Sequence, residues 1–230
     1  MIRHATHRSR LVAAAIAIPA LIAACSSGGG AATVGPATIG PSEAGGGPTD
    51  CPTTQPAPLG SDEKRLVTIS TSEGDIQIEV DGALSPIAAG NFVALAECGW
   101  YDGVIFHRVI PGFVIQGGDG QFGRSPNVDP NQVGTGGPPY TIEDEPVTAK
   151  YGRGTVAMAR TNAPNSVGSQ FFIVTDDAAE GALSSYNTYQ IVGNVTSGMD
   201  VVDTIVNAPR NQNDLPDEPV VMNTVTVSTP

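Results

Sequence analysis

The sequence predicts a mainly β domain with two helices, preceded by a segment of different composition. From about residue 66 onward, short runs of β-branched and aromatic residues alternate with turn-forming Gly, Pro, Asn and Asp, which is typical of strands. Two stretches instead carry apolar residues at helical spacing after residues that commonly begin helices. The chain has 230 residues, enough for one ordinary domain and additional segments.

The first two strands are predicted by alternation with period two. The runs 67–70 and 76–80 flank Glu73-Gly74-Asp75, so they indicate a hairpin. Next, Ser85-Pro86 predicts an N-cap and the first residue of a helix that ends at Gly99.

The later elements are predicted in the same way, around a polar, proline-containing loop at 121–132. A second helix is expected at 199–206, after Ser197-Gly198. Further strands are expected at 155–160, 170–175, 189–195 and 220–227.

The chain is acidic, which restricts its partners. It has 11 Lys+Arg against 23 Asp+Glu and a formal net charge of −12. Nucleic-acid binding needs a basic face, so we expect no nucleic-acid partner. His107 is the only histidine beyond the first ten residues, and no cysteine has a metal-ligand partner at a useful spacing. We therefore expect no metal and no cofactor.

Residues 1–24 predict a signal peptide. They begin with several arginines and continue in an apolar run that is too short to span a bilayer comfortably. The small residues directly before Cys25 resemble the lipobox of bacterial lipoproteins, in which the cysteine thiol receives a diacylglycerol and the mature chain carries fatty acids such as palmitate. We therefore expect an extracytoplasmic protein anchored to the bacterial cell membrane through Cys25. An ordinary secretory signal with an incidental cysteine is the alternative.

Residues 25–65 are rich in Gly, Pro, Ser, Thr and Ala and nearly lack large apolar residues. That composition predicts a flexible linker without helix or strand, so the folded domain is expected at 66–230. Beyond Cys25, the chain keeps Cys51 and Cys98. In an oxidising compartment these two can pair, and we hypothesise a disulfide between them. Two unpaired thiols remain the alternative.

The central stretch, 106–119, reads FHRVIPGFVIQGGD. Pro111-Gly112 separates two apolar runs, so two short strands joined by a turn are predicted. Arg108 and Gln116 lie among these apolar residues. Because an arginine is costly to bury without a partner, two interpretations remain open. Either a carboxylate holds Arg108 in a structural ion pair, or the strands form the floor of a groove that aims a guanidinium and an amide at a ligand.

This stretch resembles the signature segment of the cyclophilins, which are peptidyl-prolyl cis-trans isomerases. A second stretch, TVAMARTNAPNSVGSQFFI at 155–173, and the Gly-Thr-Gly-Gly loop at 134–137 resemble cyclophilin motifs in the same order. The resemblance extends from about residue 66 to the C-terminus. It implies a closed antiparallel β-barrel of about eight strands capped by two α-helices.

The resemblance also implies the site residues. Arg108, Phe113 and Gln116 are expected to be catalytic. A larger set is expected to bind substrate: His107, Val114, Gly134, Ala159, Arg160, Thr161, Gln170, Phe172, Leu183 and Tyr189. Of these, His107 is interpreted as a structural histidine beside the arginine.

The sequence departs from the family pattern at the pocket. Val114 stands where methionine is common, and Tyr189 where many members have a histidine. Many members also have a tryptophan shortly upstream of that position. This chain has none there, and Leu183 is the candidate for that wall of the pocket. Cyclosporin, a macrocyclic ligand of the family, is therefore expected to bind more weakly.

The implied function is peptidyl-prolyl cis-trans isomerisation of secreted or cell-envelope proteins, with a folding or chaperone role. The implied substrates are proline-containing polypeptides, the chain is expected to be a monomer, and the membrane is reached through the lipid anchor. The alternative is a non-catalytic cyclophilin-like module that binds proline-containing segments.

Overall fold

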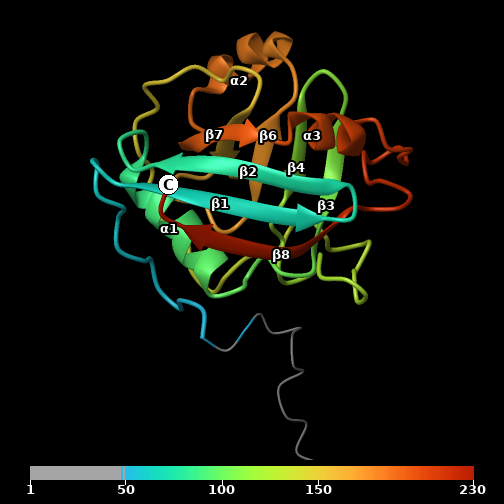
Figure 1. Cartoon of the computed structure of the whole chain (residues 1–230), viewed down its shortest axis with the longest axis horizontal. Coiled ribbons are helices and arrows are strands. Elements are labelled where there is room, and N and C mark those ends of the chain that lie inside the picture. Colours follow the sequence, from blue (N-terminus) through green and yellow to red (C-terminus); the bar gives the residue numbers. More distant parts are fainter. Residues whose placement is uncertain (1–47, 49) are drawn as a thin grey trace, which may run out of the picture. The chain divides into compact units, whose positions relative to one another are not determined.

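The computed structural model describes residues 48 and 50–230, which contain a closed antiparallel barrel of eight strands (Figure 1). The predicted signal peptide, Cys25 and the first part of the predicted linker lie outside the described residues. Around the barrel the strands follow the order β1-β2-β7-β5-β6-β4-β3-β8, and β8 pairs with β1 to close it. The strands are β1 (Lys64–Thr71), β2 (Gly74–Asp81), β3 (Val104–Ile110), β4 (Val114–Gly117), β5 (Thr155–Met158), β6 (Phe171–Val174), β7 (Ile191–Ser197) and β8 (Val221–Ser228).

The β1–β2 hairpin follows the predicted alternation. Val67 and Ile69 on β1 and Ile76 and Ile78 on β2 are fully buried or nearly so, and the residues between them are more exposed. Gly74 sits at the turn with φ of +127°, a conformation that favours glycine. The barrel interior is therefore filled by alternate residues of each strand.

Two of the three helices were predicted. α1 (Pro86–Glu97) packs against β1, β2, β7 and β8, and α3 (Met199–Val206) packs against β2, β3 and β4. They lie on opposite sides of the barrel in Figure 1. The structure adds a third helix that was not predicted, α2 (Glu180–Tyr186), which follows a short 3₁₀ turn, η1 (Asp177–Ala179). Since α2 buries only Leu183, its sequence has no helical apolar stripe that could have indicated it.

The start of α1 differs from the prediction in one detail. Ser85 occupies the N-cap, but its side chain makes no capping hydrogen bond. The carboxylate of Glu145 instead accepts hydrogen bonds from the backbone N–H groups of Ile87 and Ala88, both at 2.9 Å. The first N–H groups of a helix need acceptors, and here a residue from a distant loop supplies them.

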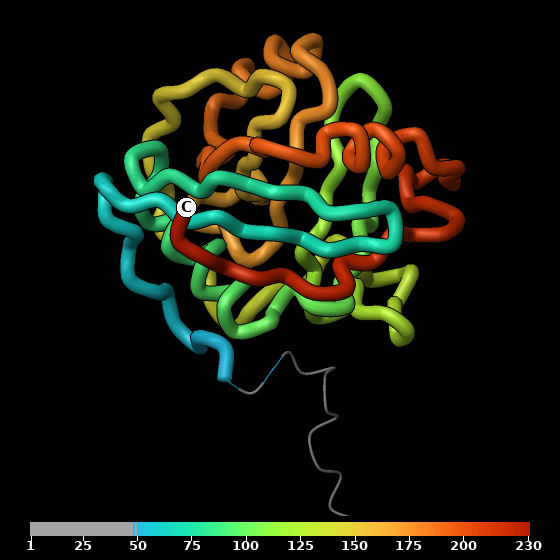
Figure 2. The backbone as a smooth tube through the Cα atoms, in the orientation of Figure 1, coloured from blue at the N-terminus to red at the C-terminus, as the bar shows by residue number. Residues whose placement is uncertain are grey.

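The segment before the barrel, residues 50–63, is called the strap here. Its composition predicts a linker without helix or strand, but β1 begins at Lys64 and the strap already packs on the domain, along its side in Figure 2. Leu59 is buried, and its N–H donates to the carbonyl of Pro86 at 3.0 Å. Gln55 accepts a hydrogen bond from the N–H of Glu143 at 3.0 Å. The linker composition therefore does not prevent this part from docking.

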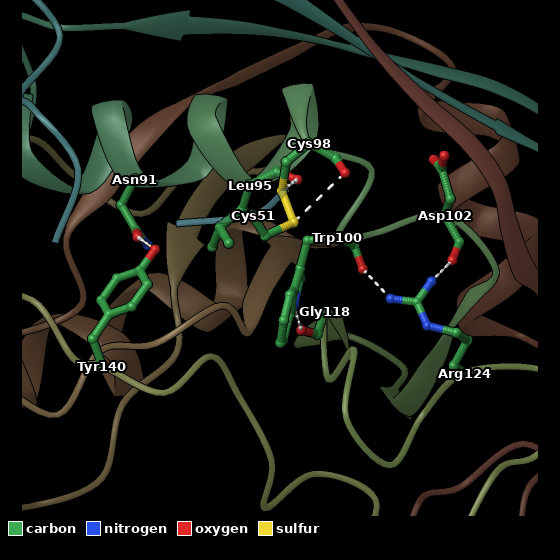
Figure 3. The surroundings of a disulfide bond; sticks show 9 residues. All are labelled: Cys51, Asn91, Leu95, Cys98, Trp100, Asp102, Gly118, Arg124 and Tyr140. Carbon is green, nitrogen blue, oxygen red and sulfur yellow. Dashed lines mark hydrogen bonds between the residues drawn. A yellow bond between two sulfur atoms is a disulfide. The ribbon is translucent and has the colours of Figure 1, made fainter. Parts of the chain in front are cut away.

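A disulfide joins the strap to the end of α1, as hypothesised from the sequence. The Cys51 and Cys98 Cα atoms lie 5.1 Å apart and the sulfur atoms 2.00 Å apart (Figure 3), within the usual range for a disulfide. Trp100, two residues after Cys98, is buried and donates its indole N–H to the carbonyl of Gly118 at 3.4 Å. This tryptophan is therefore part of the structural core below the disulfide.

The core has two parts because several strands are buried on both faces. On β6, Phe171 and Ile173 point into the barrel, whereas Phe172 and Val174 belong to a second cluster outside it. α2 contributes Leu183 to this outer cluster. The outer cluster provides a firm apolar base on which a binding site can be built.

Candidate active site

A bulge in β3 places Arg108 on the outer face of the barrel. Phe106 pairs with Gly117 of β4, but Arg108 already pairs with Gln116, so His107 is the extra residue. Bulges of this kind re-aim side chains and are common beside active sites. Without the bulge, strict alternation would turn Arg108 into the barrel together with Phe106.

The bulge aligns Arg108 with a row of residues that crosses four strands. Arg108 on β3 is opposite Gln116 on β4, Gln116 is opposite Phe172 on β6, and Phe172 is opposite Ala157 on β5. Directly opposed residues point to the same face of a sheet. The guanidinium, an amide and an aromatic ring are therefore side by side on one rigid surface.

A cavity of about 160 Å³ opens above this row and is called the apolar pocket here. Its lining includes most of the predicted site residues: Arg108, Phe113, Val114, Gln116, Ala159, Arg160, Phe172, Leu183 and Tyr189. The rings of Phe172 and Tyr189 meet edge to face, with centroids 5.3 Å apart. Leu183, 3% exposed, reaches the pocket from α2. The pocket thus combines aromatic and aliphatic side chains with the guanidinium groups of Arg108 and Arg160.

A second, larger cavity of about 430 Å³ adjoins the first and is called the polar groove here. Gln116, Ala159 and Arg160 line both cavities. The groove is otherwise bounded by the Gly134–Gly137 loop and by residues that follow β5 or precede β6, among them Thr161 and Gln170. The predicted residues that are absent from the pocket thus lie here, except for His107.

A directed chain of hydrogen bonds connects the two cavities. Arg108 donates through Nη1 to Oε1 of Gln116 at 3.3 Å, and Gln116 donates through Nε2 to Oε1 of Gln170 at 3.0 Å. Gln170 then donates to the carbonyl of Gly136 at 2.9 Å. Because a guanidinium can only donate, the arginine determines which way both amides point.

Arg108 also has a carboxylate beside it. Its Nε lies 3.9 Å from Oδ2 of Asp214, and its side chain remains 39% exposed. The two interpretations left open by the sequence are therefore compatible, because the same guanidinium is paired and lines the pocket.

His107 lies behind this surface and lines neither cavity. Its side chain is 5% exposed, and neither ring nitrogen has a hydrogen-bond partner within the described residues. Burial lowers its pKa from 6.5 to about 4, with Arg108 adding to the decrease and Asp119 opposing it. The structure therefore gives His107 a packing position against Gly134 rather than a place in the binding surface.

Arg160 holds the loop between the two cavities. Its guanidinium pairs with Asp144 at 2.9 Å and donates to the carbonyls of Thr161 at 3.1 Å and Ala163 at 2.8 Å. The side chain is only 9% exposed. Asp144 and Asp214 were not found from the sequence, because each lies in an irregular loop that no motif connects to its arginine.

Residues 48 and 50–230 contain no group of three or more His, Cys, Asp or Glu side chains placed to hold a metal ion. The same residues include no helix with the length and apolarity needed to cross a bilayer.

Comparison with known proteins gives one consistent result. Residues 66–227 match the family described as cyclophilin type peptidyl-prolyl cis-trans isomerase/CLD. A probable peptidyl-prolyl cis-trans isomerase of Brucella abortus (strain 2308) is 41% identical over 155 residues, which are 66% of this chain and 77% of that protein. A peptidyl-prolyl cis-trans isomerase of Streptomyces antibioticus is 41% identical over 164 residues, 68% of this chain and 94% of that protein.

Solved structures agree with the sequence relatives. The crystal structure of a Cryptosporidium parvum cyclophilin type isomerase superposes with a TM-score of 0.61 at 31% identity, covering 73% of this chain and 99% of that one. The barrel, the apolar pocket and the relatives lead to the same assignment: the chain belongs to the family of cyclophilin-type peptidyl-prolyl cis-trans isomerases.

Proposed function

We propose that this isomerase acts through the guanidinium of Arg108. Rotation about an amide bond faces a barrier of about 18–20 kcal/mol because resonance gives the C–N bond double-bond character. No bond is made or broken in the rotation, so no nucleophile, metal or general base is needed. A catalyst must instead stabilise the twisted amide, in which the prolyl nitrogen regains a lone pair.

The site supports this role by its arrangement. Arg108 lines the apolar pocket together with Phe113 and Phe172, so a proline ring held there brings its nitrogen to the guanidinium. A hydrogen bond to a charged donor contributes about 1.5–3 kcal/mol, which corresponds to roughly 10- to 100-fold in rate. The remaining acceleration comes from excluding water and from holding one side of the bond while the other turns.

The residues preceding proline are assigned to the polar groove. It adjoins the pocket through Gln116, Ala159 and Arg160, and its Gly134–Gly137 loop and Gln170 offer polar groups to a peptide backbone. A related Cryptosporidium parvum isomerase has been crystallised in the presence of the dipeptide Ala-Pro, which supports proline-containing peptides as substrates here.

The cellular setting is proposed from the N-terminal sequence. The lipobox-like residues before Cys25 support a lipid-anchored protein outside the cytoplasm that acts on secreted or cell-envelope proteins. We further propose that it acts as a monomer. Replacing Cys25 by Ser is expected to abolish lipid attachment and to block processing or move the protein to the soluble fraction. Unchanged membrane association of the Cys25→Ser variant would contradict the anchor.

Cyclosporin is proposed as a weak ligand. At the position of Leu183, tryptophan-bearing members provide an indole N–H and a flat wall, whereas leucine has no donor. Leu183 lines the apolar pocket, which supports it as the residue that replaces that wall.

Turnover separates the enzyme from a module that only binds proline-containing segments. In a protease-coupled assay on an X-Pro tetrapeptide, the full-length chain in a mild detergent is expected to accelerate isomerisation, and the Arg108→Ala variant serves as the matched control. Equal, uncatalysed rates for both proteins, together with measurable peptide binding, would favour the non-catalytic module.

A further inference from the structure

The loop between α3 and β8 (residues 207–220) brings a carboxylate to the outer edge of the active site. Asp214 is anchored there by its backbone, because the N–H of Val109, the neighbour of Arg108, donates to the Asp214 carbonyl at 2.9 Å. The N–H of Asp214 in turn donates to the carbonyl of Asn211 at 3.1 Å. The side chain of Asn211 closes the turn by accepting from the N–H groups of Asn213 at 2.8 Å and Leu215 at 3.3 Å.

Asp214 also adopts a conformation that few residues tolerate. Its φ is +62°, in the left-handed region where Asn, Asp and Gly are favoured. The backbone is thus tied to β3 on one side and to its own turn on the other. The Cα of Asp214 is therefore held in a defined place, from which the side chain reaches Arg108.

The carboxylate lies between two arginines. Oδ2 is 3.9 Å from Nε of Arg108, and Oδ1 is 3.5 Å from Nε of Arg210. Arg108 is meanwhile held at Nη1 by Gln116. Gln116 thus holds the guanidinium by a hydrogen bond at Nη1, Asp214 lies at ion-pair distance from Nε, and Nη2 makes no hydrogen bond to protein within the described residues.

We propose that Asp214 is a positioning residue that orients the guanidinium of Arg108 toward the prolyl nitrogen. This inference rests on the role proposed for Arg108. A long side chain gives up rotamer freedom when it is fixed, and a donor that is already oriented does not have to do so during each turnover. Asp214 and Gln116 fix the plane from two sides, so the unpaired N–H groups of Nη2 are left to face the substrate.

The test uses Asp214→Asn in the full-length chain, solubilised in a mild detergent. Asparagine tolerates the positive φ and keeps an acceptor oxygen, but it lacks the charge. We expect kcat/KM for an X-Pro tetrapeptide to fall about three- to fivefold, the upper end of what is expected for losing a partly exposed charged contact. The loss is expected in kcat with KM almost unchanged, because the contact serves the transition state.

The matched control is Asp217→Asn. Asp217 is exposed on the same loop, and its carboxylate makes no ion pair within the described part of the chain. The control removes the same charge and is expected to leave kcat/KM within about twofold of wild type, as for ordinary surface substitutions. An equal loss in both variants would overturn the proposal, because it would reflect only the charge of the loop.

A double-variant cycle separates positioning from a merely structural role. In an Arg108→Ala background, Asp214→Asn is expected to have no further effect, because it acts through the missing guanidinium. An additive loss would overturn the proposal, and so would an unchanged or raised kcat/KM in the single variant. If Arg108→Ala alone leaves turnover intact, the proposed role of Arg108 fails as well. A fall in Arg108→Ala without a fall in Asp214→Asn removes only this inference.

Discussion

Replacing Glu145 by alanine should destabilise the domain strongly, although Glu145 is far from α1 in the chain. Its carboxylate accepts from Ile87 and Ala88 at the start of α1 and from the side chain of Gln190 at 3.0 Å. Losing a helix cap costs about 0.5–2 kcal/mol. Leaving the fully buried Gln190 amide with fewer acceptors costs about 1–3 kcal/mol more. The combined loss is about 3 kcal/mol.

For a domain of this size, that loss corresponds to a decrease in Tm of about 6–12 °C. Thermal and urea unfolding followed by circular dichroism measures it. Glu143→Ala is the matched control, because Glu143 is exposed and its carboxylate has no partner within the described residues, where only its backbone makes hydrogen bonds. A Tm for Glu145→Ala within about 2 °C of the control, less than 1 kcal/mol, would refute the capping argument.

Three further predictions concern the disulfide, His107 and cyclosporin. The disulfide closes a loop with a sequence separation of 47, so Cys51→Ser combined with Cys98→Ser should lower the free energy of unfolding by up to about 4 kcal/mol; equal urea midpoints for both proteins would contradict this. Because burial lowers the pKa of His107 from 6.5 to about 4, the unfolded chain binds more protons than the folded chain between these two pH values. The free energy of unfolding is therefore not reduced by this group above pH 6.5, and it falls by up to about 3 kcal/mol as the pH drops toward 4. Unfolding free energies that have the same pH dependence in wild type and His107→Gln would exclude that contribution. Cyclosporin inhibition should be weaker by roughly 10- to 100-fold than in tryptophan-bearing members, because Leu183 supplies neither the hydrogen bond nor the aromatic wall; inhibition as tight as theirs in a titration would show that another side chain fills the wall.

Much of the fold could be predicted because it depends on local patterns. The alternation in 67–70 and 76–80 predicted the β1–β2 hairpin, and Pro86 at the first helical position predicted where α1 begins. α2 could not be predicted in this way, since Leu183 is its one buried residue. The capping of α1 by Glu145 was equally out of reach, because it depends on a contact across 57–58 residues.

The candidate site, like the fold, could be predicted from the sequence only in part. Motif resemblance placed Arg108, Phe113 and Phe172 in one site, and the structure brings them together around the apolar pocket. The reason Arg108 reaches that pocket is the bulge at His107, and no local pattern in an apolar strand reveals a bulge. The strap shows another limit of prediction from sequence. Its composition is that of a linker, yet Leu59 within it is buried.

Arg108 is proposed to stabilise the twisted amide more than it binds the ground-state peptide. This role is tested most directly by comparing Arg108→Ala with wild type in two measurements, kcat/KM for an X-Pro tetrapeptide and the dissociation constant of the same peptide. Arg108→Lys, which keeps the charge but not the planar fork of donors, should fall between the two proteins in turnover. Arg108→Ala is expected to lose at least about tenfold in kcat/KM while peptide affinity changes little. An unchanged kcat/KM, or an equal loss in turnover and in affinity, would contradict it.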